Sequence, residues 1–460
     1  MCVNILACSC GSFVIPQRYV LAFVLTIGVI LAYNMRLCFH IAITEITVLE
    51  SGSNNRTRWT EGGQGIVLAS FSAGYLVSYI GALLLMTHTD GKHILGTSFL
   101  ASAILSCLTP VTVKGASVWG SLAIRVILGC SQGLMYPAIQ LLLSEWIPKD
   151  SRFRVTSFLH TCPLFAAAVG YACSGYGIWY FKYWETIFYV WGVVGIGWYC
   201  IYLVTCYSKP SKHPCITPHE KEFLENNTGP PSIPVPLKVL LNDNSVAPVL
   251  VFFFGHALLI STITIELPKF FVGALKCDVN ESGMYSSLCF AIICVSCIIS
   301  NTVADVIIGT NMLGVFQTRK TLACMSTLGS MAFLILGSAM TSTTDVIVCI
   351  CISMAFIGCW YPGPRVNISD ITFKFGSLLI CFGEGMASVT GIIVPYVVAI
   401  LAKQQTLEEW RIIFIILAVI YVVTMIPFLL FGTGERARWD RSSISVQNDH
   451  YKGNIWQLSV

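Results

Sequence analysis

The chain has 460 residues, of which 55% are hydrophobic and only 11% are charged, whereas soluble domains carry about 25% charged residues. This composition predicts an integral membrane protein rather than a soluble domain. The formal net charge of +4 is small, and Lys and Arg are spread between apolar segments, so a nucleic-acid-binding surface is not expected.

About twelve windows of roughly 20 mainly apolar residues are long enough to cross a bilayer as helices. They begin near Val20, Gln64, Ile94, Val118, Thr156, Glu185, Val246, Gly283, Lys320, Thr344, Phe375 and Ile412. The longest polar interruption, residues 207–244, divides the chain into halves of six spans each. Two six-helix bundles around a central path form the major facilitator fold, whose site lies near the membrane midplane between the halves.

The expected fold class is therefore an all-α membrane protein with twelve transmembrane helices in two six-helix bundles. The predicted domains are an N-terminal segment (1–19), an N-terminal bundle (20–206), a central loop (207–244), a C-terminal bundle (245–433) and a C-terminal tail (434–460).

The distribution of Lys and Arg predicts the orientation, because cytosolic loops carry an excess of both residues. With both termini in the cytosol, most of these residues fall on cytosolic segments. Two sequons then lie outside, at Asn55 after the first span and at Asn280 after the seventh, and both are candidate glycosylation sites. The expected location is the plasma membrane, or a lysosomal or vesicular membrane.

The first apolar span contains Asn34, Arg36 and His40 in the stretch "LAYNMRLCFHIAI". A charge near the bilayer centre costs about 2.5 kcal/mol or more, so Arg36 is a candidate for function. A guanidinium stays charged and presents a planar fork to a carboxylate or phosphate. The alternatives are that Arg36 neutralises a buried acid or extends to the membrane surface. His40 could titrate, or it could be hydrogen-bonded to a neighbouring helix.

Three further places carry polar groups in or beside apolar spans. The turn "HTDGKH" after the second span resembles a degenerate form of the glycine- and base-rich loop of the facilitator superfamily, which clamps neighbouring helices. Asp90, Gly91 and Lys92 are the residues that remain of it, and the alternative is a plain polar turn. In the tenth span, Asn367 and Asp370 lie one helical turn apart on one face, which suits an interhelical lock or a ligand contact.

The third of these places is the eleventh span, where Glu384 stands between two glycines in "CFGEGMASVTG". An acid in the membrane is costly, so Glu384 is expected either to pair with an arginine such as Arg36 or to be available to a cation. Flanking glycines permit local unwinding that exposes carbonyl groups, as transporters use for ions. Glu384 and His40 are therefore the candidate coupling groups for a co-transported Na⁺ or H⁺.

The approach to the central loop and the loop itself resemble solute carrier family 17, the organic-anion and phosphate transporters that include sialin and the vesicular glutamate transporters. The residues that match the pattern of that family are Trp184, Phe188, Tyr189, Gly192, Gly195, Trp198, Pro210, His213, Pro214, Ile216, Glu220 and Lys221. Further matches are "YNMR" at 33–36, "RVILGCSQGLMYPAIQLLLSEWIPKDSRFR" at 125–154, "IELPKFF" at 265–271 and "VNISD" at 366–370. The resemblance covers residues from about 20 to 440.

This resemblance implies that Arg36 and Arg125 face a central cavity and that Arg36 meets the anionic group of the substrate. Proton-driven members have two glutamates and a histidine along the fourth span, where this chain has Leu128, Gln132 and Gln140. None of these three side chains can titrate, and Gln132 resembles the sodium-phosphate branch of the family. Gln132 and Gln140 are nevertheless expected at the substrate site.

The sequence thus predicts a secondary active transporter of a small organic anion or inorganic phosphate, which works by alternating access and is coupled to a cation gradient or to the membrane potential. It is expected to be a monomer in membrane lipid, with a small anionic solute as partner and no cofactor or metal. A facilitative anion uniporter and a non-transporting anion-sensing receptor are the alternatives. An enzyme is not expected, because the loops show no Ser/His/Asp set, P-loop or metal-ligand spacing.

Overall fold

The computed structural model describes residues 16–51, 59–85, 90–228, 245–372 and 375–437. All regular elements in these ranges are helices, and twelve of their segments are long and apolar enough to cross a membrane. The predicted starts of the spans agree with the observed ones to within about two helical turns. The prediction of an all-helical, multi-pass membrane protein is confirmed.

The first half of the chain forms six spans. Its helices are α1 (Gln17–Ser51), α2 (Glu61–Leu85), α3 (Gly91–Gly133), α4 (Met135–Trp146), α5 (Lys149–Phe181) and α6 (Thr186–Thr205). Helices α3 and α4 together provide the third span, Gly91–Gly115, and the fourth, Val118–Trp146.

The central segment and the second half follow. The central elements are η1 (Pro210–Lys212) and α7 (Pro218–Asn227). The second half consists of α9 (Ala247–Gly273), α10 (Val279–Gly309), α11 (Val315–Cys324), η2 (Met325–Gly329), α12 (Ser330–Ala339), α13 (Thr343–Ile357), η3 (Gly358–Trp360), η4 (Tyr361–Arg365), α14 (Val366–Ile371), α15 (Gly376–Leu401) and α16 (Leu407–Phe431). The ninth span runs from α11 to α12, and the tenth from α13 to α14.

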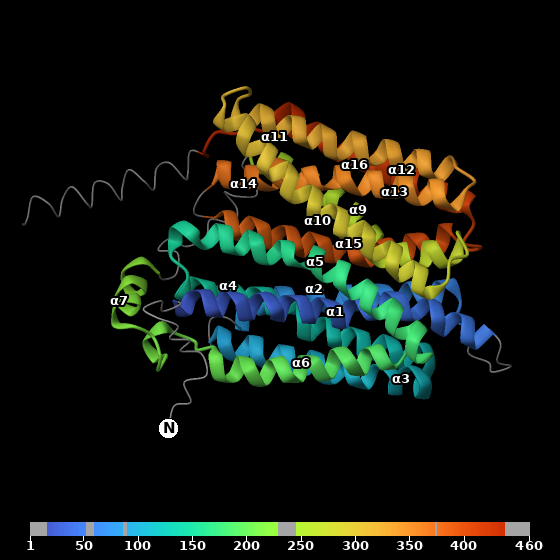
Figure 1. Cartoon of the computed structure of the whole chain (residues 1–460), viewed down its shortest axis with the longest axis horizontal. Coiled ribbons are helices and arrows are strands. Elements are labelled where there is room, and N and C mark those ends of the chain that lie inside the picture. The colour runs from blue at the N-terminus through green and yellow to red at the C-terminus, as the bar shows by residue number, and fades with distance from the viewer. Residues whose placement is uncertain (1–15, 52–58, 86–89, 229–244, 373–374, 438–460) are drawn as a thin grey trace, which may run out of the picture.

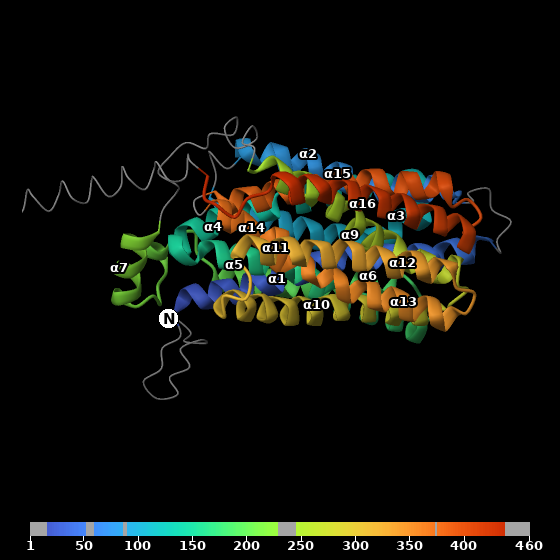
Figure 2. The ribbon, with the colours of Figure 1, turned by 90° about the horizontal axis from the view of Figure 1, so that it is seen from above.

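The two halves lie side by side, with α1–α6 on one side and α9–α16 on the other (Figure 1). Helix α5 packs against α10, and α2 packs against α15, so these four helices form a large part of the interface between the halves (Figure 2). We call the end at which α1 begins and α16 finishes the termini end. The domain boundaries stay predictions, since the limit at 244/245 adjoins residues outside the described ranges.

Glycines allow helices α2 and α3 to pack backbone against backbone. A Cβ atom added at Gly74 would lie 2.1 Å from the carbonyl oxygen of Val126, and one added at Gly129 would lie 2.1 Å from that of Phe71. Small residues permit such close approach between helices in a membrane. This contact fixes Phe71, which lines the site described below, against α3.

The halves touch at the end opposite to the termini end. There Lys269 of α9 pairs with Glu61 of α2, and the side-chain amide of Gln405 donates to the same carboxylate at 3.2 Å. A Cβ atom at Gly175 of α5 would lie 2.9 Å from the Cα atom of Gly283 of α10. The two halves are therefore in close contact at this end.

The central segment packs against the first half at the termini end. The indole Nε1 of Trp146 donates to the carbonyl of Tyr207 at 2.8 Å. The carboxylate of Glu220, on α7, accepts hydrogen bonds from the backbone N–H groups of Gln17 at 2.9 Å and Arg18 at 3.2 Å. The first N–H groups of a helix have no partner within that helix, so Glu220 acts as a distant cap for α1.

Candidate functional site

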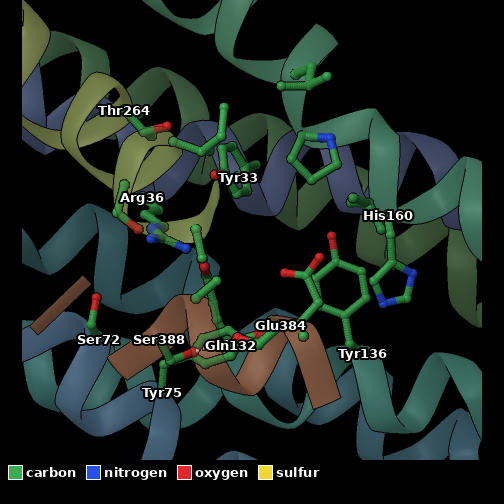
Figure 3. A pocket seen from close by; sticks show the side chains of 18 of the residues that line it. Tyr33, Arg36, Ser72, Tyr75, Gln132, Tyr136, His160, Thr264, Glu384 and Ser388 are labelled. Carbon is green, nitrogen blue, oxygen red and sulfur yellow. Dashed lines mark hydrogen bonds between the residues drawn. The ribbon is translucent and has the colours of Figure 1, made fainter. Parts of the chain in front are cut away.

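A cavity of about 130 Å³ lies between the two halves and is lined by both of them (Figure 3). Its polar and aromatic lining includes Tyr33, Arg36, Phe71, Ser72, Tyr75, Gln132, Tyr136 and His160 from the first half. The second half contributes His256, Ser261, Thr264, Trp360, Tyr361, Arg365, Glu384 and Ser388. Such a position between two six-helix halves is where carriers of this architecture bind their solutes.

Arg36 projects into this cavity from α1 (Figure 3). Its guanidinium carbon lies 4.7 Å from the ring centre of Phe71 and 5.2 Å from that of Tyr33. These faces are attractive to a cation but cannot neutralise it. Among the described residues, none of the ion pairs includes Arg36, and its buried Nε atom has no hydrogen-bond partner.

Arg125 differs from Arg36, although both are arginines in apolar spans. It is only 1% exposed and does not line the cavity. One of its terminal nitrogens donates to the backbone carbonyl of Arg36 at 3.4 Å, and its guanidinium carbon lies 5.0 Å from the ring centre of Phe71. Its position therefore suits orienting the helix that carries Arg36, rather than the direct solute contact expected from the sequence.

The two glutamines of the fourth span also lie in different surroundings, since only Gln132 lines the cavity. Gln132 lines the cavity, and its amide donates to the carbonyl of Ala32 in α1 at 2.9 Å. Gln140 lies outside the lining, where its side-chain oxygen accepts from the hydroxyl of Thr156 at 3.3 Å. Gln132 thus lies at the cavity, while Gln140 links α4 to α5.

Glu384 lines the cavity from α15, on a different wall from Arg36 (Figure 3). Within the described ranges it belongs to no ion pair. The expected pairing with Arg36 is therefore absent from this conformation of the described chain, and Glu384 instead faces the space that a solute or cation would enter. Arg36 and Glu384 thus both line the cavity, and neither has an oppositely charged partner in the ion pairs of the described residues.

His40 is buried away from the cavity lining. Its Nδ1 lies 3.5 Å from the hydroxyl of Tyr171, which donates to the backbone carbonyl of Thr264. This chain of contacts connects α1, α5 and α9. Of the two interpretations of His40, the interhelical contact is the one that its surroundings support.

Three basic residues of the cavity lining, Arg365, His160 and His256, were not assigned from the sequence. Arg365 was visible only as an arginine at a Pro- and Gly-rich point of the tenth span. His160 stacks on Tyr136 with ring centres 4.4 Å apart, and His256 stacks on Trp360 with centres 3.7 Å apart. No sequence pattern marks His160 or His256, because a single histidine in an apolar helix looks the same in the sequence whether it faces a cavity or another helix.

The predicted clamp at 90–92 lies at the start of α3. Asp90 is exposed, whereas a Cβ atom at Gly91 would lie 2.9 Å from the carbonyl oxygen of Ala138 in α4. Lys92 donates to the carbonyl of Leu203 at the end of α6, at 3.3 Å. Gly91 and Lys92 thus join α3 to α4 and α6, and these contacts suit the clamping alternative, which stays a prediction.

The predicted pair on α14 makes contacts within the second half. Asp370 accepts from Nε of Arg319 at 3.0 Å, and the side-chain amide of Asn367 donates to the carbonyl of Thr433 at 3.1 Å. Neither residue lines the cavity. The interhelical lock is therefore the alternative that these contacts support.

The candidate glycosylation sites stay predictions. Asn55 lies outside the described residues. Asn280 stands in the first turn of α10 and is partly buried, and the hydroxyl of Ser282 in its sequon donates to the carbonyl of Pro268 at 2.9 Å. The described residues contain no group of three or more His, Cys, Asp or Glu that could hold a metal ion.

The chain matches known transporters along most of its length. The family model described as Major Facilitator Superfamily matches residues 8–383. A putative inorganic phosphate cotransporter of Drosophila melanogaster is 26% identical, over 92% of this chain and 86% of that protein. Vesicular glutamate transporter 2 of Homo sapiens is 25% identical, over 94% of this chain and 77% of that protein. The resemblance to solute carrier family 17 is thereby confirmed.

Solved structures show the same fold at low identity. A bacterial homologue of the human lysosomal transporter Spinster, inward-facing and occupied, matches with a TM-score of 0.69 and 12% identity, over 91% of this chain and 97% of that one. A D-xylose-proton symporter matches with a TM-score of 0.66 and 13% identity, over 91% of this chain and 99% of that one. The prediction of this fold is thus confirmed, as is the prediction of a transporter in place of an enzyme.

Proposed function

Because this chain belongs to the Major Facilitator Superfamily, we propose that it carries a small organic anion or inorganic phosphate across its membrane by alternating access. The observation that carries the proposal is Arg36, a guanidinium in the cavity between the halves that has no carboxylate partner among the described residues. Burying a cation without a counter-charge is costly, so a guanidinium in this position favours the binding of an anion. The relatives named for phosphate and glutamate carry small anions, in agreement with this.

The proposed transport is secondary active symport, driven by a cation gradient or by the membrane potential. Glu384 is the proposed coupling group, since it faces the same cavity as Arg36 and can attract a Na⁺ ion or a proton. Leu128, Gln132 and Gln140 cannot titrate, so these three positions of the fourth span do not supply a proton site. His40 is the weaker candidate because it lies outside the cavity lining.

Alternating access requires that the halves separate at one end while they touch at the other. The contacts of Lys269 with Glu61 and of Gly175 with Gly283 close the end opposite to the termini end. With both termini in the cytosol, as the Lys and Arg distribution favours, this closed end faces outwards. The membrane concerned is the plasma membrane, or a lysosomal or vesicular one.

The test is uptake of labelled anions by purified protein in liposomes, with the sodium gradient, the proton gradient and the voltage varied separately. The panel contains inorganic phosphate, glutamate and other small carboxylates. Accumulation that depends on one of the gradients is the expected result. Uptake that never exceeds equilibrium under any gradient would indicate a facilitative uniporter. Binding of an anion without counterflow would indicate an anion-sensing receptor, and the proposal of transport would be withdrawn.

A further inference from the structure

Arg365 is a second guanidinium in the cavity, and it comes from the half of the molecule opposite to Arg36. It is 6% exposed and lines the cavity from η4. Its Nε atom is buried without a hydrogen-bond partner among the described residues, and none of the ion pairs there includes it. A buried guanidinium with unused donors requires an anion or further acceptors.

The backbone that carries Arg365 departs from a regular helix. Gly363 has φ −84° and ψ −108°, and prolines stand on both sides of it at Pro362 and Pro364. The irregular turn is held from α11, where Nη1 of Arg319 donates to the carbonyl of Pro362 at 2.7 Å. Helix irregularities of this kind are frequent at functional sites. Here the irregular turn precedes a charged side chain that faces the cavity.

Arg365 also reaches across the interface between the halves. Its Nη2 donates to the backbone carbonyl of Ser157 in α5 at 3.4 Å, which is long for a hydrogen bond to a charged donor. A carboxylate or phosphate oxygen is a stronger acceptor for a guanidinium than a single backbone carbonyl. An anion that enters the cavity can therefore replace Ser157 as the acceptor for Arg365.

The charges of the cavity favour a solute with two negative charges. Arg36, Arg365 and Glu384 are its charged lining residues within the described chain. Once a cation neutralises Glu384, as the proposed coupling requires, two guanidiniums remain without a counter-charge. A monovalent anion would leave one of them buried and unpaired, which is costly in a low-dielectric site.

We propose that Arg365 is a second anion-binding residue, and that the preferred solute is a dianion held between Arg36 of one half and Arg365 of the other. This inference rests on the proposed function, because it assumes that the cavity is the solute site. A dianion held in this way would connect the two halves through its own charges, so that solute binding and the movement of the halves are linked.

The test compares pairs of anions that differ in charge but little in shape. Succinate is paired with succinamate, and sulfate with methanesulfonate, and their dissociation constants for the purified full-length protein are measured at constant ionic strength. Counterflow of labelled succinate and sulfate in liposomes is measured in parallel. The parent protein is expected to bind each dianion at least about tenfold more tightly than its partner, the size of one hydrogen bond to a charged group. Arg365→Gln is expected to remove that preference while monoanion binding remains.

Arg411→Gln is the matched control, because Arg411 is exposed at the start of α16 and donates to the carbonyl of Ser338, outside the cavity. It should leave the preference unchanged. If Arg365→Gln does not fold, Arg365→Lys is used, and a weaker dianion preference is expected because ammonium lacks the planar fork.

The possible failures are distinct. Equal binding of the members of each pair by the parent, or an unchanged preference in a folded Arg365 variant, would overturn the dianion inference and leave anion transport standing. If the parent transports anions but only monovalent ones, the inference also fails. If no anion binds or moves, both the inference and the proposed function fail.

Discussion

At the scale of single residues, Arg36 shows how a charge is kept in an apolar span without an acid beside it. Phe71 and Tyr33 present their ring faces to the guanidinium of Arg36, and Arg125 donates a hydrogen bond to the backbone carbonyl of Arg36. The aromatic faces attract the guanidinium by about 0.5–2 kcal/mol each, but they carry no negative charge. The counter-charge that they do not provide is the one that an anionic solute would bring.

Arg36→Lys is expected to reduce uptake by about tenfold or more, although it conserves the charge. An ammonium group offers point donors in place of a planar fork, and a lost hydrogen bond to a charged partner is worth about 1.5–3 kcal/mol. Initial rates of anion uptake in liposomes measure the effect, with the amount of folded protein checked by size-exclusion chromatography. Near-parental uptake by a folded Lys variant would remove Arg36 from the solute site.

Glu384→Gln is expected to separate exchange from accumulation. The amide keeps the shape of the side chain but cannot bind a cation or a proton, so anion counterflow should persist while gradient-driven accumulation is lost. Both are measured in the same liposomes, with and without an imposed gradient. A variant that still concentrates the anion as the parent does would place coupling in another group, and His40 would be tested next.

At the scale of elements, close glycine contacts set the position of the helices that carry the site. Gly74 and Gly129 allow α2 and α3 to meet along their backbones, and Phe71 is thereby fixed between Arg36 and Arg125. On the other half, Arg319 binds both Asp370 and the carbonyl of Pro362, and so holds the irregular turn that precedes Arg365. In each half, the charged residue at the cavity depends on packing at another element.

Gly74→Ala is expected to destabilise the protein by about 1–3 kcal/mol, the usual cost of an overpacked contact. The new methyl group would meet the carbonyl of Val126 and force α2 away from α3. Gly81→Ala is the matched control, since it lies on the same helix and its Cβ atom would meet no atom within 4 Å. Thermal unfolding in detergent is the measurement. Equal melting temperatures for the two variants would contradict the close contact seen between these helices.

At the scale of the whole molecule, the proposed alternating access requires the two halves to change which end is closed. In this conformation they touch at the end opposite to the termini end, where Gly175 and Gly283 let α5 and α10 approach. On α5 the contact lies about four helical turns from the cavity residue His160, and on α10 it lies about two turns from the cavity residue Phe290. It therefore offers a way to disturb the closing movement without changing the solute site.

Gly283→Leu is expected to abolish net uptake while anion binding in detergent stays within about threefold of the parent. The leucine side chain would occupy the space of Gly175 and prevent closure at this end, and an interface that cannot close cannot complete the cycle. Gly309→Leu, on the same helix with no atom within 4 Å of its added Cβ, is the control and should transport normally. Normal uptake by Gly283→Leu would show that this contact is not needed for the cycle.

The sequence by itself determined the membrane class, the twelve spans and the relationship to anion carriers. These properties are local, because each span is decided by the apolar content of about 20 neighbouring residues. The candidate site was determined in part: Arg36, Gln132 and Glu384 were predicted and do line one cavity. A charge in an apolar span is costly wherever it lies, so its presence indicated function without reference to the rest of the chain.

Only the tertiary structure decided which of the polar groups meet. Arg36 and Arg125 have the same sequence signal, yet Arg125 is enclosed against Phe39 and Phe71 while Arg36 faces the cavity. Arg365 enters the site because an irregular turn, held by Arg319, lies at that depth of the second half. The direction of a side chain depends on helix rotation and bending, which are set by contacts between residues far apart in the chain, and no local pattern records these.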